Sequence, residues 1–278
     1  MSEASIPQKI GFPEKLLDEK PVRLDVIGAK FGQYAAVNKP ADMLFDAYSG
    51  APKKKSVITA LKEQEGKGEL KRLGMESPAA VSQTDFEMSG AALLALNKNS
   101  AASMRNAIGS GYFSFSYIFL CRKSKIPSEK FDVTLPTLMH EERPIWIVSH
   151  RFGKKTRTSF ELLEKSGEYE LWSASASEPR PHQVRLHAAE SGLKIVGERV
   201  YSKTPPVFMS NLKEEYKLAG TEEWERALYP HMSLHLSRIK FDGRALNDPN
   251  LGDVEISAEL PKGLAVCLKR LGFSKAQI

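Results

Sequence analysis

The sequence predicts an α+β fold, in which helices flank a large mixed, mainly antiparallel sheet. Many segments alternate apolar and polar residues with the period of two that is typical of strands. Segments with helical spacing and capping residues lie between them at irregular intervals, which favours α+β over a regular strand–helix repeat. Residues 1–20 show no pattern, and no Pro- or Gly-rich linker divides the remainder. We therefore expect an irregular N-terminal leader over residues 1–20 and a single domain over residues 21–278.

The N-terminal half begins with two predicted strands around a glycine turn, VRLDVIGAKFGQYAAVNKP, residues 22–40. A helix is predicted at SVITALKEQ, with Ser56 as its N-cap. AALLALNK, residues 91–98, is typical of a strand. NSAASMRNAIGSG indicates a helix that is capped by Asn99 or Ser100 and stops at Gly109. YFSFSYIFLCRK, residues 112–123, alternates strongly and predicts a further strand.

The C-terminal half continues with four predicted strands, FDVTL, PIWIVSH, TSFELLEK and YELWSASAS, within residues 131–177. A short helix is expected next, between Pro181 and Gly192. The polar stretch from Ser210 to Glu225 indicates a helical insert or a flexible excursion. HMSLHLSRIKF, residues 231–241, alternates as a strand, and GLAVCLKRLG is an amphipathic helix near the C-terminus.

Composition limits the classes of function. The chain has 278 residues, a formal charge of +6 and a pI of about 9.1, which suit a phosphate-rich partner without requiring one. Cys121 and Cys267 lie in apolar runs and are expected to be buried thiols of a reducing compartment. No stretch approaches the roughly 18 apolar residues of a membrane span, and no signal peptide is apparent. We expect a cytoplasmic protein without a membrane partner.

The most informative segment is RPHQVRLH, residues 180–187, which continues to Tyr201. Pro181 suits the first turn of a helix, and Gly192 suits the position after its end. His182 and Arg185 are three residues apart and are predicted to share a face at the positively polarised helix start. This arrangement suits an anionic ligand or a paired carboxylate. A basic amphipathic helix that only docks on a sheet is the alternative.

This segment resembles the motif Arg-Thr-His-Gln-(Ile/Leu/Val)-Arg-x-His of RluA-type RNA pseudouridine synthases, with Pro181 in place of Thr. The continuation Val196-Gly197-Glu198 and Tyr201 is similar to that family's Gly-Asp-x-x-Tyr. The matching motif residues are Arg180, His182, Gln183, Arg185 and His187. The resemblance implies a pseudouridine-synthase-like fold with a central basic cleft.

A second segment, residues 82–90 (SQTDFEMSG), resembles the family's catalytic loop His-Arg-Leu-Asp-x-x-Thr-Ser-Gly. Asp85 stands in the place of the catalytic aspartate. The departures are Ser82, Gln83, Thr84 and Met88. Gln83 replaces an arginine that in the family helps to take the target base out of its stack, so a planar cation is lost. A solvated aspartate in a turn is the alternative for this segment by itself.

Three weaker matches follow family order. VNKPADML, residues 37–44, resembles the strand-end motif Asn-Lys-Pro-x-Gly-(Met/Leu), with Asp42 in place of Gly; an ordinary strand exit at Lys39 is the alternative. Tyr117 lies where the family carries its active-site tyrosine, although a core aromatic is the simpler interpretation. Leu234-His235-Leu236, Phe241 and Leu260-Pro261 resemble the closing strand and helix. His231 and His235 have metal-ligand spacing only in a helix, so no metal site is predicted.

The resemblance implies isomerisation of a uridine in ribosomal or transfer RNA to pseudouridine, without a cofactor, by a monomer. Asp85 would act on the flipped nucleotide, Arg185 would keep Asp85 ionised, and Tyr117 would pack on the uracil and assist proton transfer at carbon 5. Attack on the ribose, attack on the base and removal of a ribose proton are all open to Asp85. The residues expected to contact RNA or support the site are Lys39, Gln83, Arg180, His182 and Gln183. The alternatives are an inactive RNA-binding or ribosome-assembly factor, and an unrelated enzyme acting on a small nucleotide or acidic substrate.

Overall fold

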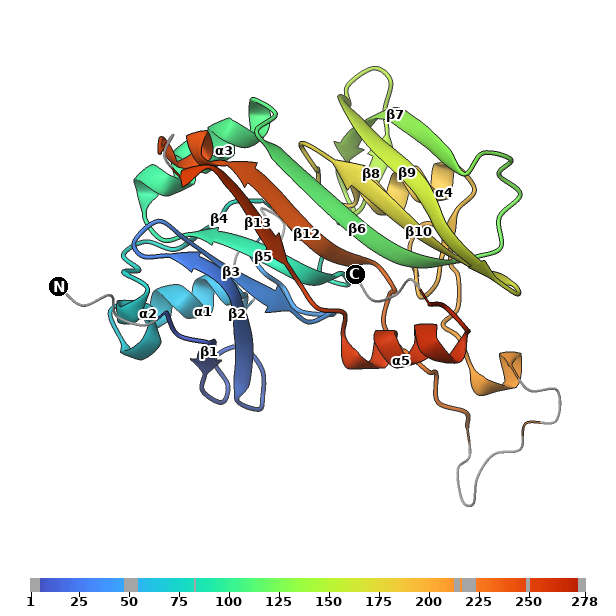
Figure 1. The fold of residues 1–278 in the computed structure, drawn as a ribbon, viewed down its shortest axis with the longest axis horizontal. Helices are drawn as coiled ribbons and strands as arrows, with labels where there is room; N and C mark the ends of the chain where they lie inside the picture. The colour runs from blue at the N-terminus through green and yellow to red at the C-terminus, as the bar shows by residue number, and fades with distance from the viewer. Residues whose placement is uncertain are drawn as a thin grey trace. The chain divides into compact units, whose positions relative to one another are not determined.

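The computed structural model describes residues 6–47, 55–82, 84–212, 216, 224–248 and 251–274. It divides into two compact units, each built from segments that are distant in sequence. The first unit consists of residues 1–115, 177–181 and 236–259, and the second of residues 116–176, 182–235 and 260–278. Figure 1 shows the elements of both.

The first unit contains a sheet with the strand order β1-β2-β3-β5-β12, in which β4 also pairs with β5 and β13 with β12. The pairings of β1 with β2, β2 with β3, β3 with β5, β4 with β5 and β12 with β13 are antiparallel. The strands are β1 (Lys9–Phe12), β2 (Val22–Lys30), β3 (Tyr34–Lys39), β4 (Ala79–Ala80), β5 (Ser89–Ala95), β12 (His235–Asp242) and β13 (Asp253–Ser257). The predicted strand pair in residues 22–40 is confirmed, with a turn at Gly32, whose φ is +66°. β1 lies inside the segment that was expected to be irregular, so that expectation is wrong for residues 9–12. The strand has only two buried apolar residues, Ile10 and Phe12, and an alternation this short does not predict a strand.

Helices cover this sheet. Helix α1 (Val57–Glu63) packs Val57, Ile58, Ala60 and Leu61 into the same core as β3 and β5. The predicted Ser56 cap is confirmed, and Thr59 completes a capping box with it. The short α2 (Gly68–Arg72) follows. Helix α3 (Lys98–Gly109) ends where predicted but is capped by Asn97, whose Oδ1 accepts from the Ser100 amide at 2.8 Å. The prediction of Asn99 or Ser100 as the N-cap is wrong, because the helix already begins at Lys98 and both residues lie inside its first turn.

The second unit contains strands in the order β10-β9-β7-β8, with β6 beside β10 and β11 beside β6. The pairings of β10 with β9, β9 with β7, β7 with β8 and β11 with β6 are antiparallel. They are β6 (Phe113–Arg122, of which Ser116 onward belongs here), β7 (Lys130–Met139), β8 (Trp146–Val148), β9 (Lys154–Ser166), β10 (Tyr169–Ala176) and β11 (Lys194–Ile195). All four strands predicted in residues 131–177 are present. Helix α5 (Lys262–Arg270) packs Leu264, Cys267 and Leu268 against β6 and β10. Cys121 and Cys267 are buried free thiols, as predicted.

Helix α4 (Gln183–Glu190) begins two residues later than expected. His182 precedes it in the left-handed conformation, with φ of 58°, so Pro181 lies outside the helix and not in its first turn. The expected shared helical face of His182 and Arg185 is therefore wrong, since only Arg185 belongs to the first turn. Gly192 has the predicted positive φ, 87°.

The remaining described elements are two short 3₁₀ helices, η1 (Met209–Asn211) and η2 (Gly243–Leu246). Most of the polar stretch from Ser210 to Glu225 lies outside the described residues. None of the helices in the described part of the chain has the length and apolar content needed to cross a bilayer. No group of three or more His, Cys, Asp or Glu residues in that part could hold a metal ion.

Candidate active site

Asp85 lies in the loop between β4 and β5 of the first unit. Its neighbours Thr84 and Met88 are buried, Asp85 itself is half-buried, and the side chain of Phe86 is 47% exposed. The two departures from the family motif at positions 84 and 88 therefore pack inward. The buried side chains of Thr84 and Met88 therefore hold the two ends of the segment that contains Asp85.

The loop is tied to the end of β3 by Lys39, which is 1% exposed. Lys39 Nζ donates hydrogen bonds to the carbonyls of Pro40 and Met43 at 3.1 Å each and to that of Phe86 at 3.3 Å. It also donates to the carbonyl of Met88. One buried ammonium group thus connects the exit of β3 with the part of the loop that directly follows Asp85.

The charge of Lys39 is coupled to that of Asp85. Burial lowers the pKa of Lys39 to about 7, and the negative charges of Asp85, Asp42 and Glu87 oppose this shift, Asp85 most strongly. The structure brings together Lys39 and Asp85, which are 46 positions apart in the sequence.

Two backbone positions explain parts of the motif pattern. Asp42, which stands where the family has glycine, adopts the left-handed conformation with φ of 57°. Aspartate tolerates this region better than most residues, so the substitution is compatible with the turn. Gly90 has φ of 118°, and a Cβ there would overlap the backbone of Leu236 on β12. The glycine of the motif is thus required by close packing of β5 on β12.

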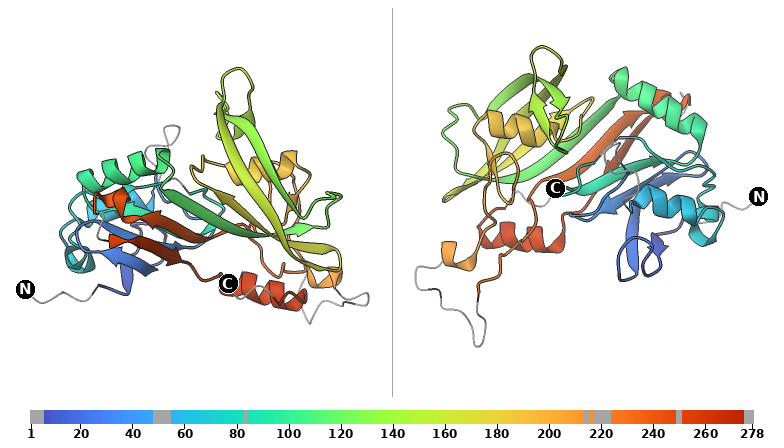
Figure 2. Two further views of the ribbon diagram at one scale, coloured as in Figure 1. Left: turned by 45° about the horizontal axis from the view of Figure 1, so that its top comes forward. Right: turned by 180° about the vertical axis from the view of Figure 1, so that it is seen from behind.

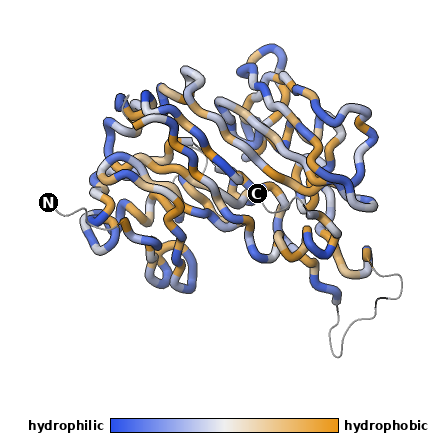
Figure 3. The backbone as a smooth tube through the Cα atoms, viewed as in Figure 1, coloured by the Kyte–Doolittle hydropathy of each residue, from blue (hydrophilic) through white to orange (hydrophobic). Residues whose placement is uncertain are grey.

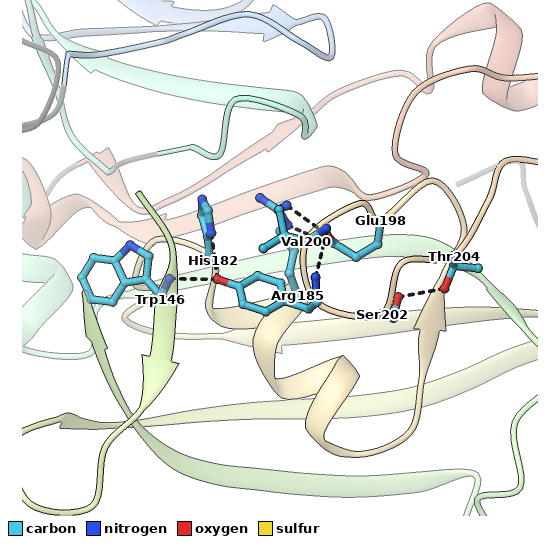
Figure 4. Close-up of polar contacts among 8 residues, drawn as sticks. Trp146, His182, Arg185, Glu198, Val200, Ser202 and Thr204 are labelled. Carbon is cyan, nitrogen blue, oxygen red and sulfur yellow. Dashed lines mark hydrogen bonds and ion pairs between the residues drawn. The ribbon is translucent and has the colours of Figure 1, made fainter. Parts of the chain in front are cut away.

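In the second unit, Arg185 forms a buried ion pair with Glu198 (Figure 4). Arg185 Nε donates to Oε2 at 2.6 Å and Nη2 donates to Oε1 at 3.1 Å, and both side chains are 1% exposed. Burial raises the pKa of Glu198, but Arg185 and the backbone amides of Val200 and Tyr201 outweigh it, so this pKa lies below its ordinary value. The guanidinium is thereby held in one plane by a carboxylate that stays ionised.

Tyr201 extends this network. The Arg185 guanidinium lies 5.5 Å from the centre of the Tyr201 ring, and Tyr201 Oη is 2.9 Å from His182 Nδ1. The amide of Trp146 donates to the same hydroxyl at 3.0 Å. Figure 4 shows His182, Arg185 and Glu198 among the residues of this network. The left-handed backbone at His182 therefore directs its imidazole to Tyr201.

Three other predicted site residues are buried or are paired with other side chains of the protein. Gln183 is buried, and its Nε2 donates to the carbonyl of Arg157 and to Thr158 Oγ1, both at 2.9 Å. Tyr117 is buried in β6, with 4% exposure. Arg180, in the first unit, pairs with Glu178 at 2.5 Å. Gln83 lies outside the described residues.

The structure therefore forms two clusters. In the first unit, Lys39 and Asp85 are linked through the loop, whereas in the second unit Arg185 and His182 share a network with Glu198 and Tyr201. The pairing of Asp85 with Arg185 and Tyr117 joins residues of different units and stays a prediction. Glu198 and Tyr201 were not predicted as site residues, although both stand in the motif continuation VGERVY that carried the resemblance.

Comparisons with known proteins agree with these motifs. The family model described as RNA pseudouridylate synthase matches residues 33–190. The chain is 22% identical over 213 residues to ribosomal large subunit pseudouridine synthase D of Buchnera aphidicola subsp. Acyrthosiphon pisum, covering 72% of this chain and 62% of the relative. It is 24% identical over 119 residues to an uncharacterized RNA pseudouridine synthase of Chlorobaculum parvum, covering 43% of this chain and 34% of the relative. The chain thus spans about one third to three fifths of the length of these two relatives.

Two solved human structures are similar over most of the chain. RNA pseudouridylate synthase domain containing 4 has a TM-score of 0.63 at 15% identity, covering 90% of this chain and 93% of that chain. RNA pseudouridylate synthase domain containing 1 has a TM-score of 0.54 at 17% identity, covering 90% and 95%. At these identities the similarity establishes the fold, and the predicted α+β pseudouridine-synthase-like fold is confirmed. Because the family model matches more than half of the sequence, the chain belongs to the RNA pseudouridylate synthase family.

Proposed function

We propose that the chain is an RNA pseudouridine synthase that isomerises a specific uridine in ribosomal or transfer RNA, with Asp85 as its catalytic aspartate. Family membership supports the reaction type. The observation that carries the assignment of Asp85 is its loop, in which a buried lysine holds the backbone at Phe86 and Met88, directly after a half-buried carboxylate. A relative named for the ribosomal large subunit makes ribosomal RNA the first substrate to examine.

The reaction would proceed on a nucleotide taken out of its stack, at a cost of about a few kcal/mol. Asp85 acts on this nucleotide, the bond between N1 and the ribose breaks, and the uracil rotates while it is held. Carbon 5 then bonds to the ribose, loses its proton, and N1 gains one. Tyr117 packs against the ring and assists this proton transfer. The atoms balance without a cofactor or an external reactant.

Arg185 has the role of orienting Asp85 in this proposal. Its guanidinium is fixed in one plane by Glu198 through Nε and Nη2, which makes it a rigid donor for a second carboxylate. A cation at hydrogen-bonding distance from Asp85 would hold that carboxylate in one orientation.

The test is to map pseudouridine in ribosomal and transfer RNA from cells with the protein, without it, and with Asp85→Asn. We expect at least one position to lose pseudouridine in the deletion strain and in Asp85→Asn, while the variant binds RNA within about tenfold of the parent, or 1.4 kcal/mol. Asp25→Asn is the matched control, since Asp25 is an exposed carboxylate paired with Lys9. Unchanged RNA in the deletion strain would favour the RNA-binding alternative, and full activity of Asp85→Asn would remove Asp85 from the mechanism.

A further inference from the structure

The turn between β8 and β9, residues 149–153, and the first two residues of β9 expose an aromatic ring among cations. Phe152 is 66% exposed, and its basic neighbours His150, Arg151, Lys154 and Lys155 are exposed as well. In the left view of Figure 2 this yellow-green turn projects from the strands of the second unit. In Figure 3 the turn is coloured mainly as hydrophilic. What distinguishes this ring from other exposed apolar side chains is that four basic residues surround it in the sequence.

The turn is held in shape by its own hydrogen bonds. The Ser149 amide donates to the carbonyl of Pro136 on β7 at 3.0 Å, and the Gly153 amide donates to the carbonyl of Ser149 at 2.8 Å. The Phe152 amide lies 3.3 Å from its acceptor, Ser149 Oγ. A Cβ at Gly153 would overlap both Ser149 and Pro136, so only glycine allows this close approach. Phe152 is therefore presented by a backbone that is already ordered before any ligand binds.

The cations of the turn are available for an anionic ligand. Arg151 lies over the Phe152 ring, with 4.9 Å from its guanidinium carbon to the ring centre. Arg157, further along β9, is paired with Asp132 at 2.7 Å. Arg151, Lys154 and Lys155, by contrast, form no ion pair within the described ranges of the chain. The free face of an aromatic ring and three unneutralised cations thus lie within five residues.

We propose that this turn binds a single-stranded segment of the RNA substrate, with one base stacked on Phe152 and phosphates contacted by Arg151, Lys154 and Lys155. Stacking on an aromatic side chain accepts any base, and a cationic groove or rim follows the backbone, so the two together suit unpaired RNA. The identity of the ligand as RNA rests on the proposed function. The binding itself is independent of turnover at Asp85.

The experiment measures binding of the full chain to an oligouridylate carrying fluorescein at one end, by fluorescence anisotropy. We expect Phe152→Ala to weaken binding by about tenfold, which corresponds to 1.4 kcal/mol. Phe152→Trp should bind at least as tightly as the parent, because the stacking surface is retained. Phe31→Ala is the matched control, since Phe31 is 63% exposed and lies in the turn between β2 and β3. It should bind like the parent.

Salt dependence tests the phosphate contacts. The slope of log K against log salt should become shallower by about 1.4 in the double variant Lys154→Gln/Lys155→Gln, at 0.7 per phosphate on single strands. Parent-like affinity of Phe152→Ala would overturn the inference, as would equal competition by polyglutamate, which would indicate an acidic protein partner. Pseudouridine formation is measured on the same samples. A Phe152 effect without turnover would refute only the proposed reaction, whereas turnover without a Phe152 effect would refute only this inference.

Discussion

Replacing Glu198 by glutamine removes the counter-charge of a buried arginine while keeping the size of the side chain. Glu198 and Arg185 are each 1% exposed and are joined by two hydrogen bonds of 2.6 and 3.1 Å. Loss of one partner from such a pair costs about 3–5 kcal/mol, because the remaining charge stays buried. The unfolding free energy of a typical protein is about 5–15 kcal/mol. We therefore expect Glu198→Gln to lose a large part of the stability at pH 7, about 3–5 kcal/mol.

The sign of the pH dependence follows from the lowered pKa of Glu198 in the folded state. The stabilisation from Glu198 is present above its ordinary pKa of 4.5 and is lost as the pH falls through the lower folded-state value. The difference between the parent and Glu198→Gln should therefore shrink in acid.

Urea denaturation at pH 7 and at successively lower pH measures both effects. Glu255→Gln is the control, since Glu255 pairs with Arg238 and Lys240 at a side-chain exposure of 45%, and no measurable loss is expected. A cost of Glu198→Gln below about 1 kcal/mol at pH 7 would refute the reasoning, because a buried charge left without its partner cannot be so inexpensive.

Two further predictions concern the cations near the site. Arg185→Lys should reduce the rate of pseudouridine formation at least about a hundredfold, or 2.7 kcal/mol, because lysine retains the charge but not the planar fork. A single-turnover assay measures this rate, and a parent-like rate would leave Arg185 only a general electrostatic role. Lys39 has a folded-state pKa of about 7 against an ordinary 10.5, so its unfolded form binds more protons between these values and the stability of the parent should rise with pH there. Lys39→Met should lack this rise in denaturation profiles between pH 7 and 10, and parallel profiles would contradict the lowered pKa.

Local signals predicted most of the fold. The strong alternation of residues 112–123 and the Ser56 cap are decided by neighbours in sequence, and both are present in the structure. The helix start near Pro181 was wrong because the left-handed turn at His182 depends on a contact with Tyr201, 19 positions away. A short-range pattern contains no information about that contact.

The candidate site was predicted less completely than the fold. The motif resemblance located Asp85 and Arg185, but the partners that hold them depend on tertiary packing. The four carbonyls around Lys39 come from two loops, and their convergence on one ammonium is not visible in the strand-exit motif. Glu198 was visible in the sequence as a carboxylate in the motif continuation, yet its pairing with Arg185 required the structure.

The close approach of Gly90 to Leu236 has a consequence for biosynthesis. β5 directly follows the Asp85 loop, and its neighbour β12 is encoded near the end of the chain. At about 5–20 residues per second, on the order of ten seconds pass between the emergence of the one strand and that of the other. During this interval the buried strand β5 lacks one of its two edges, and the nascent polypeptide carries an incomplete Asp85 loop. The growing chain should therefore acquire catalytic competence late in translation, and ribosome-bound intermediates that stop before β12 should be protease-sensitive at the Asp85 loop.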